Sequence, residues 1–150
     1  MYSRTLYAGW GDMDFNSHMA NTAYINKCGD VRLRFFAENG FPIEEFMRLK
    51  IGPITMRDEL DYFKEVGLMQ EITISMALAG LSTDGSRWLV RNELLRAGKA
   101  CARVQSAGGW LDLAIRKLVI PPQDLLAAIM KLDRTEDFGV LSSSVKSDGA

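Results

Sequence analysis

Carboxylate, imidazole and amide side chains are concentrated in one stretch near the N-terminus, GWGDMDFNSHMANTAYI. It holds Asp12, Asp14 and Asn21, together with His18, the only histidine among the 150 residues. A carboxylate can attack an electrophilic carbon or activate a water molecule, and an imidazole with an ordinary pKa of about 6.5 exchanges protons near neutral pH. These residue types could therefore supply a nucleophile or a general base, although an Asp before a helix is also commonly a plain N-cap.

A long helical pattern begins directly after this stretch. From about residue 22 to 39, apolar side chains recur at intervals of four, three and four, which stacks them on one helical face. Other apolar residues fall outside that stripe, so the helix is expected to be buried on several sides. Asn39-Gly40 then supplies a stop signal. The residues of the stripe are Tyr24, Cys28, Val31 and Phe35, and those outside it are Ile25, Leu33 and Phe36.

The remaining segments alternate between apolar and polar side chains, as β-strands do. Residues 2 to 10 indicate one strand, and four more follow in GPITMRDELDYFKEV, EITISMALAG, SRWLVRNELL and ACARVQSAGGWLDLAIRKLVI. STDGS and RAGK have turn chemistry, and hairpin connections make a sheet antiparallel. Gly108-Gly109 predicts a bulge or bend inside the last segment. PPQDLLAAIMKL indicates a short terminal helix.

This order of elements predicts an α+β fold in which an antiparallel five-stranded sheet wraps around a long central helix. Residues 1–134 are expected to form one domain, whereas residues 135–150 lack periodicity and are expected to be a disordered C-terminal tail. Such a sheet leaves an unpaired edge, which natural proteins seldom expose. A second subunit is therefore expected to complete it.

The composition argues against several classes of partner. Lys plus Arg number 18 and Asp plus Glu number 19, so the chain carries no electrostatic footprint for nucleic acid or for an anionic membrane. No stretch has the length of a signal-peptide core or of a membrane span, and a cytoplasmic protein is expected. Cys28 and Cys101 lack metal-ligand spacing. Cys28 is expected to be a buried reduced thiol, and neither a metal nor another cofactor is expected.

The segment GWGDMDFNSHMANTAYINKCGDVRLRFF resembles the opening motif of the 4-hydroxybenzoyl-CoA thioesterase family of hotdog-fold proteins. The resemblance extends less sharply to DELDYFKEV and GGWLDLAIRKLVIPP, and so covers residues 2 to about 133. It departs at Ser17, where the family usually has Gly, and at Ala20, where it has the first of two asparagines. The matching residues are Trp10, Asp12, Asp14, His18, Asn21, Tyr24, Asp30 and Arg32.

The resemblance implies the hotdog fold, hydrolysis of an acyl-CoA thioester to free acid and CoA, and a homodimer with one continuous sheet, often paired into a homotetramer. It makes Asp14 the catalytic carboxylate, as nucleophile or as general base, and the backbone N–H of Asn21 the group that polarises the carbonyl. A helix start suits the second role, because its first N–H groups lack intrahelical acceptors and lie at the positive end of the helix dipole.

Four further residues occupy positions at which the family binds its substrate. The resemblance places His18 and Tyr24 beside the acyl part of the substrate, and Arg87 and Arg116 beside the phosphates of CoA. Each also has a plainer explanation. The histidine could order its loop, the tyrosine could pack in the core, and the two arginines could be solvated side chains at strand ends.

Three acidic or amide residues of the motif also have structural explanations. Asp12 is expected to be a hydrogen-bond acceptor within its loop, and Asn21 could cap the helix with its side chain. Asp30 and Arg32 are expected to form a polar pair at the subunit contact. For the protein as a whole, an acyl carrier protein thioesterase and a non-catalytic module that binds acyl-CoA or another small ligand are the alternatives to an acyl-CoA thioesterase.

Overall fold

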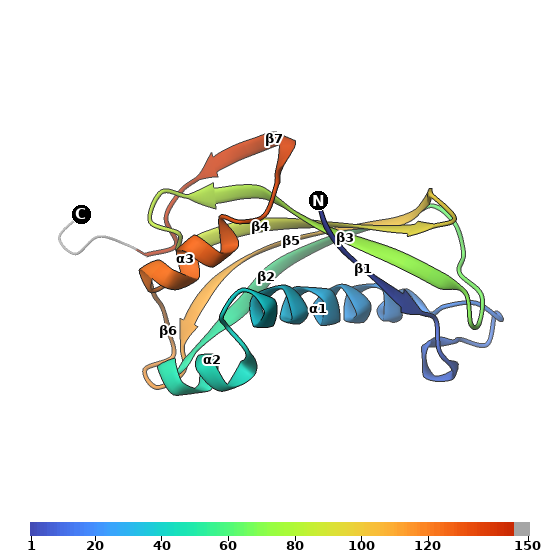
Figure 1. The fold of residues 1–150 in the computed structure, drawn as a ribbon, viewed down its shortest axis with the longest axis horizontal. Coiled ribbons are helices and arrows are strands. Elements are labelled where there is room, and N and C mark those ends of the chain that lie inside the picture. Colours follow the sequence, from blue (N-terminus) through green and yellow to red (C-terminus); the bar gives the residue numbers. More distant parts are fainter. Residues whose placement is uncertain (146–150) are drawn as a thin grey trace.

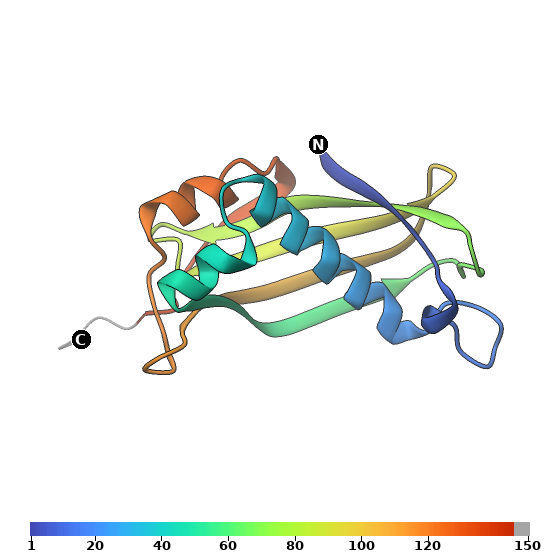
Figure 2. The same cartoon turned by 60° about the horizontal axis from the view of Figure 1, so that its bottom comes forward.

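A long helix lies across the concave face of a curved β-sheet (Figures 1 and 2). The computed structural model describes residues 1–145, and its helix α1 spans Asn21–Glu38. The helix stops at Asn39, and Gly40 follows with a φ of +90°, a backbone conformation that glycine adopts without strain. The prediction of one long helix covered by a sheet is confirmed.

Within residues 1–145 the sheet contains seven strands, which are β1 (Tyr2–Tyr7), β2 (Ile51–Tyr62), β3 (Glu71–Ser82), β4 (Arg87–Arg96), β5 (Lys99–Asp112), β6 (Lys117–Leu118) and β7 (Arg134–Leu141). The five long strands lie in the order β1-β3-β4-β5-β2, and neighbours in this order run antiparallel. The α+β class and the antiparallel five-stranded arrangement are confirmed. The order also makes β2 an edge strand.

Two shorter α-helices complete the part of the fold formed by residues 1–145. Helix α2 (Ile43–Leu49) leads from α1 into β2, and α3 (Gln123–Ile129) lies near the C-terminal half of α1 (Figure 2). The core lies between α1 and the sheet, and Cys28 and Cys101 are free and buried in it. The buried residues of α1 are Ala23, Tyr24, Cys28, Val31, Phe35 and Phe36.

The glycine pair in β5 coincides with an irregularity in the sheet. The pairing of β2 with β5 shifts between Thr55 and Arg57, so Met56 is the extra residue of a bulge opposite Gly108. A Cβ on Gly108 would lie 2.0 Å from the Ile54 carbonyl oxygen and 2.6 Å from the Trp88 ring. The predicted bulge therefore lies on β2, opposite the glycine pair, and not within the glycine segment itself. Only glycine permits the close approach of the strands at Gly108.

The first strand ends earlier than the alternation predicts. β1 stops at Tyr7, and Trp10–Asp12 forms a 3-10 turn instead of a continuing strand. The Gly9 N–H donates to the Asp12 Oδ2 at 2.7 Å, and this bond closes the turn. The prediction of a strand that continues to residue 10 is therefore wrong, and the Trp10 side chain is 84% exposed.

The prediction of a disordered tail from residue 135 is also wrong over residues 135–141, because β7 pairs with β3 in parallel. β1 occupies the first half of the same β3 edge, and β7 occupies the second half. Ser143 and Ser144 are then held by Asp84 and Ser86 of the β3–β4 turn. Residues 146–150 of the predicted tail lie outside the described residues.

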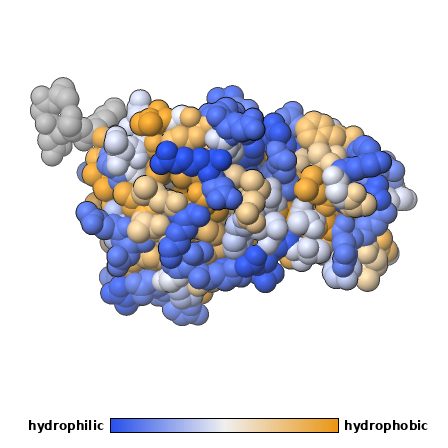
Figure 3. All heavy atoms as spheres, turned by 45° about the horizontal axis from the view of Figure 1, so that its top comes forward, coloured by the Kyte–Doolittle hydropathy of each residue, from blue (hydrophilic) through white to orange (hydrophobic). Residues whose placement is uncertain are grey.

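The two faces of the sheet differ. The concave face is covered by α1, whereas the convex side in Figure 3 carries polar side chains with apolar ones interspersed. Among the helices of residues 1–145, none is both long enough and apolar enough to cross a bilayer.

Candidate functional site

A cleft of about 300 Å³ opens at the N-terminal end of α1. Four of the residues singled out in the sequence line it together, namely Asp14, His18, Asn21 and Tyr24. The structure therefore brings the polar stretch and the helix start to one place. The remaining lining residues are Met19, Tyr62, Phe63, Lys64 and Glu65.

The start of α1 is not capped by a side chain. The N-cap residue is Ala20, whose backbone is extended with φ of −63° and ψ of 148°, and it makes no side-chain capping bond. Neither Asp14 nor Asn21 is the N-cap residue, so the capping interpretation of both is wrong. The Ala23 N–H donates to the Ala20 carbonyl oxygen at 2.9 Å. The Asn21 N–H has no intrahelical acceptor and no partner among residues 1–145, and Asn21 lines the cleft.

A tight turn holds Asp14 against this helix start. The Asp14 N–H donates to the His18 carbonyl oxygen at 3.0 Å, and the Asn16 N–H donates to the Asp14 Oδ1 at 2.8 Å. Ser17 completes the turn with a φ of +67°. Glycine reaches this left-handed region at no steric cost, which gives a physical reason for the glycine of the motif at this position.

His18 has both a structural contact and a place in the cleft. Its Nδ1 lies 3.1 Å from the Met19 carbonyl oxygen. A carbonyl oxygen only accepts hydrogen bonds, so Nδ1 carries a proton in this contact, and Nε2 is the ring nitrogen left to face the cleft. This bond supports the interpretation that His18 orders its loop, while its position among the lining residues keeps it beside any substrate in the cleft.

Two tyrosines connect the helix start to the end of β2. The Tyr62 hydroxyl donates to the Asn21 carbonyl oxygen at 3.0 Å, and the Tyr24 hydroxyl donates to the Lys64 carbonyl oxygen at 3.4 Å. Their rings meet edge to face with centroids 5.1 Å apart. Tyr24 is almost fully buried, and this burial raises its pKa, so the phenol stays neutral at the floor of the cleft.

Asp12 is a structural acceptor, as the sequence predicts. Its Oδ2 accepts from the Gly9 N–H at 2.7 Å and lies 2.8 Å from the Lys27 Nζ on α1. Partial burial alone would raise the pKa of Asp12, but the bonds from Lys27 and Gly9 outweigh it and lower that pKa. Asp12 therefore fixes the loop to the helix.

The two arginines predicted to bind CoA lie elsewhere in the subunit. Arg87 begins β4 and Arg116 lies in the β5–β6 turn, at the end of the sheet opposite the Asp14 loop (Figure 1). The Arg87 Nε donates to the Ser144 Oγ at 3.3 Å. Neither arginine lines the cleft of its own subunit.

Asp30 and Arg32 do not form the predicted polar pair. Asp30 is exposed, whereas the Arg32 side chain passes under the sheet and donates to Asn92 Oδ1 and to Ser106 Oγ, each at 2.8 Å. The residues are two apart on a helix, which points their side chains in different directions. The prediction of a pair is therefore wrong.

Sequence reasoning missed two lining residues of the cleft at the end of β2. Tyr62 and Lys64 lie about forty residues after the helix start, and DYFKEV has only strand alternation to indicate them. Met56 of the same strand is half exposed on the bulge and lines no part of the cleft. Among residues 1–145, no group of three or more His, Cys, Asp or Glu could hold a metal ion.

The arrangement places the Asp14 carboxylate and the Asn21 N–H in one cleft, at the positive end of a helix. Such a pair suits attack on a carbonyl carbon, because the carboxylate can act as nucleophile or base while the N–H group stabilises the developing oxyanion. The neutral tyrosines and Met19 add an apolar floor.

Comparison with known families agrees with this chemistry. Residues 8–129 match a family model described as the thioesterase-like superfamily. None of the curated protein sequences is significantly similar to the chain.

Several solved structures share the fold, which confirms the predicted hotdog architecture. A 1,4-dihydroxy-2-naphthoyl-CoA thioesterase from Synechocystis is 14% identical with a TM-score of 0.77, and the match covers 87% of this chain and 96% of that one. A gentisyl-coenzyme A thioesterase is 16% identical with a TM-score of 0.77, over 85% and 99% of the two chains. A Staphylococcus aureus protein in complex with CoA is 19% identical with a TM-score of 0.78, over 94% and 93%.

Proposed function

The chain belongs to the thioesterase-like superfamily, and from this premise we propose that it hydrolyses an acyl-CoA to free acid and CoA. One observation carries the proposal. The Asp14 carboxylate shares a cleft with the start of α1, where no side chain caps the N–H groups. At a finer level, the motif from Trp10 to Arg32 supports membership of the 4-hydroxybenzoyl-CoA thioesterase family.

The reaction follows from these two groups. The thioester carbonyl oxygen accepts a hydrogen bond from the Asn21 N–H, which polarises the carbonyl and stabilises the oxyanion. Asp14 then acts in one of two ways. It attacks the carbonyl carbon to give a mixed anhydride that water hydrolyses, or it removes a proton from a water molecule that attacks. In both routes the carbon–sulfur bond breaks, CoA leaves as the thiol, and the acyl group leaves as a carboxylic acid.

His18 and Tyr24 contact the substrate in this proposal. His18 presents Nε2 as an acceptor, since its Nδ1 proton is bonded to Met19. Tyr24 supplies an apolar ring beside the thioester, because its hydroxyl already donates to Lys64. Both residues line the cleft next to Asp14.

The proposed assembly is a homodimer, which pairs further into a homotetramer. A second copy would pair with the free edge of β2 and run antiparallel to it about a twofold axis. The Arg87 and Arg116 end of one subunit would then approach the Asp14 end of the other, which supports phosphate binding across the interface. The CoA bound to the Staphylococcus aureus protein of the same fold supports this class of substrate.

Thiol release from a panel of acyl-CoAs tests the proposal. We expect Asp14→Asn to lower turnover on the best substrate by about 100- to 10,000-fold, the usual range for a lost catalytic base. The melting temperature should stay near that of the wild type, because Asp14 does not cap α1.

Asp12→Asn is the matched control from the same D-x-D pair. It should lower the melting temperature and leave turnover close to the wild-type value, because Asp12 bonds to Gly9 and Lys27. Turnover that survives in Asp14→Asn would contradict the catalytic assignment. Uptake of acyl-CoA by the wild type without thiol release would identify a binding module, and release from acyl carrier protein alone would identify the carrier as the substrate.

A further inference from the structure

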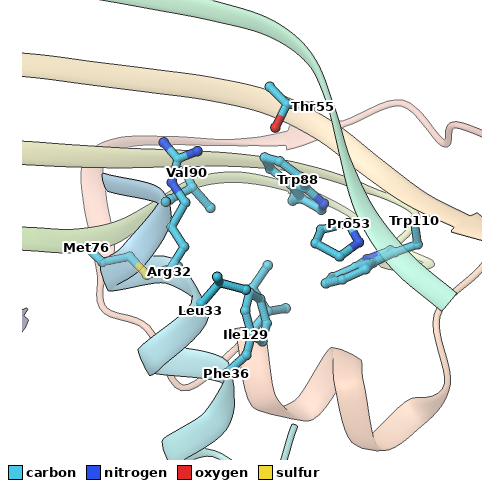
Figure 4. A pocket seen from close by; sticks show the side chains of 11 residues that line it. Arg32, Leu33, Phe36, Pro53, Thr55, Met76, Trp88, Val90, Trp110 and Ile129 are labelled. Carbon is cyan, nitrogen blue, oxygen red and sulfur yellow. The ribbon is translucent and has the colours of Figure 1, made fainter. Parts of the chain in front are cut away.

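A second cavity, separate from the cleft, lies between the C-terminal half of α1 and the sheet (Figure 4). Its volume is about 210 Å³, and its walls are mostly apolar. The Trp110 and Phe36 rings pack against each other with centroids 5.8 Å apart, which gives the cavity a firm aromatic wall. The lining residues are Gly29, Arg32, Leu33, Phe36, Pro53, Thr55, Met76, Trp88, Val90, Trp110 and Ile129.

Arg32 is the one charged residue among those that line this cavity. A guanidinium carries five N–H donors, and within residues 1–145 Asn92 and Ser106 accept from two of them. Asn92 in turn donates to the Ser75 carbonyl oxygen, and Ser106 donates to Asp58, so the arginine is fixed in place. Burial lowers the pKa of Arg32, which reflects the cost of holding this cation away from water.

The mouth of the cavity faces the free edge of the sheet. Pro53 and Thr55 of β2 are exposed, and Leu33 is 54% exposed, although all three line the cavity. An antiparallel copy of β2 would set the end of its own strand beside this mouth. That end carries Tyr62 and Lys64, which line the Asp14 cleft. The cavity of one subunit would therefore face the cleft of the other.

We propose that this cavity holds the acyl group of the substrate. Arg32 then determines specificity by binding a carboxylate at the end of the acyl group away from the thioester. The proposal rests on the thioesterase function and on the β2 dimer. An apolar protein cavity of about 150 Å³ binds benzene, so 210 Å³ accommodates a substituted ring or a compact branched chain. The unused guanidinium donors match the paired oxygens of a carboxylate, and the aromatic walls match the ring.

Two thioesters that differ at one end test the assignment. 4-Carboxybenzoyl-CoA and 4-methylbenzoyl-CoA share the ring and have substituents of similar width. Their affinities would be measured by calorimetry with the Asp14→Asn protein, in which binding is read without hydrolysis. We expect the carboxylated thioester to bind about 10- to 100-fold more tightly, the range of a charge-assisted hydrogen bond.

Substitutions at Arg32 and Leu33 separate the two parts of the proposal. In the Asp14→Asn background, Arg32→Met should abolish the preference and keep the binding of 4-methylbenzoyl-CoA, and Arg32→Lys should retain part of it. Circular dichroism confirms that each variant is folded. If Arg32→Met unfolds, the proposal is still tested by two measurements. These are the preference of the Asp14→Asn parent for the carboxylated thioester and the change of that preference in Arg32→Lys. Leu33→Trp narrows the mouth and should weaken both thioesters.

Other outcomes overturn the proposal. Equal affinities for the two thioesters would show that Arg32 does not bind the carboxylate of the acyl group. Unchanged affinities in Leu33→Trp would show that the acyl group binds elsewhere. If Leu33→Trp instead dissociates a dimer, the cavity is part of the interface with the second copy. If the wild type binds the carboxylated thioester without releasing thiol, the thioesterase proposal fails and the cavity assignment stands.

Discussion

Asp12 and Asp14 are two residues apart, yet their surroundings differ completely. Asp12 is paired with Lys27 at 2.8 Å and with the Gly9 N–H at 2.7 Å. Asp14 accepts from the Asn16 N–H beside it and borders the cleft. A carboxylate bound to an ammonium group loses basicity, because the positive charge favours the ionised form of the carboxylate. The first acid therefore serves the loop, and the second is the one available for chemistry.

Acid should remove the stabilisation that Asp12 provides. Its pKa is lowered from 3.8 in the folded protein, since the Lys27 and Gly9 bonds outweigh its partial burial. A carboxyl group with a lowered folded pKa stabilises the protein above its unfolded pKa, and that stabilisation is lost as the pH falls through the folded value. We predict that Asp12→Asn melts earlier than the wild type near neutral pH, and that this difference shrinks below pH 3.8.

Melting curves from neutral to acidic pH check this prediction. Lys27→Met is the companion variant, because it removes the cation and keeps the carboxylate. Its difference from the wild type should shrink over the same acidic range. A difference for Asp12→Asn that is constant with pH would contradict the assignment of Asp12 as an ionised partner of Lys27.

The candidate site could be predicted from the sequence where its residues are local. Asp14, Asn21 and Tyr24 lie within eleven residues, so a motif can hold them together. Tyr62 contacts Asn21 only because β2 ends beside the start of α1. Arg32 carries no sequence signal for its cavity, since its partners Asn92 and Ser106 lie on strands far along the chain. Those contacts depend on the sheet order, which side-chain periodicity does not contain.

At the scale of elements, the turn between η1 (Trp10–Asp12) and α1 contains a strained residue. Ser17 has a φ of +67° and an exposed side chain. An L-residue in this region costs roughly 1–2 kcal/mol relative to the right-handed region, and glycine avoids that cost but loses more entropy on folding. We predict that Ser17→Gly stabilises the protein by about 0.5–1 kcal/mol and raises the melting temperature by about 1–4 °C.

Calorimetric unfolding measures the effect of Ser17→Gly, with Ser17→Ala as the control. Alanine keeps the Cβ and therefore the strain, so the alanine variant should not gain stability. Equal melting temperatures for the glycine variant and the wild type would mean that the turn tolerates Ser17 without strain.

The elements with a sustained apolar period could be predicted from the sequence. Strand β7, which has no such period, was missed. α1 and the four long strands from β2 onwards repeat their apolar residues over ten or more positions. β7 is short, lies at the end of the chain and is held by outside partners. Its Asp137 binds Arg91 at 2.8 Å, and Gly80 leaves room for Leu141. Such contacts come from tertiary structure and leave no local pattern.

At the scale of the molecule, β2 is the exposed edge of the sheet. It is twelve residues long, and most of its side chains are partly or fully exposed. Long unpaired edges invite association, and a twofold axis turns such an edge into a closed dimer. Arg57 and Glu59 stand on this strand, 2.8 Å apart and 74% and 55% exposed. In the proposed dimer, we expect their charges to favour one register between the two copies of β2.

An antiparallel register centred on Asp58 places Arg57 of each copy opposite Glu59 of the other. The same register sets the two Asp58 side chains opposite each other on the other face, where each accepts from Ser106 of its own subunit. We predict this register, because the two facing Arg57–Glu59 pairs outnumber the single facing pair of acids, and opposite charges facing each other stabilise a strand pair. Arg57→Glu would then gather four acids and weaken the dimer, while Arg57→Glu combined with Glu59→Arg would restore it.

Sedimentation equilibrium gives the dissociation constants. A cross-strand charge pair contributes about 0.2–1 kcal/mol. Because Arg57→Glu replaces two attractive pairs by two repulsive ones, we expect the dimer dissociation constant to rise by about 10-fold or more. A double variant as weak as the single one would place the twofold axis elsewhere on β2, and a wild type that sediments as a 16.8 kDa monomer would contradict the dimer itself.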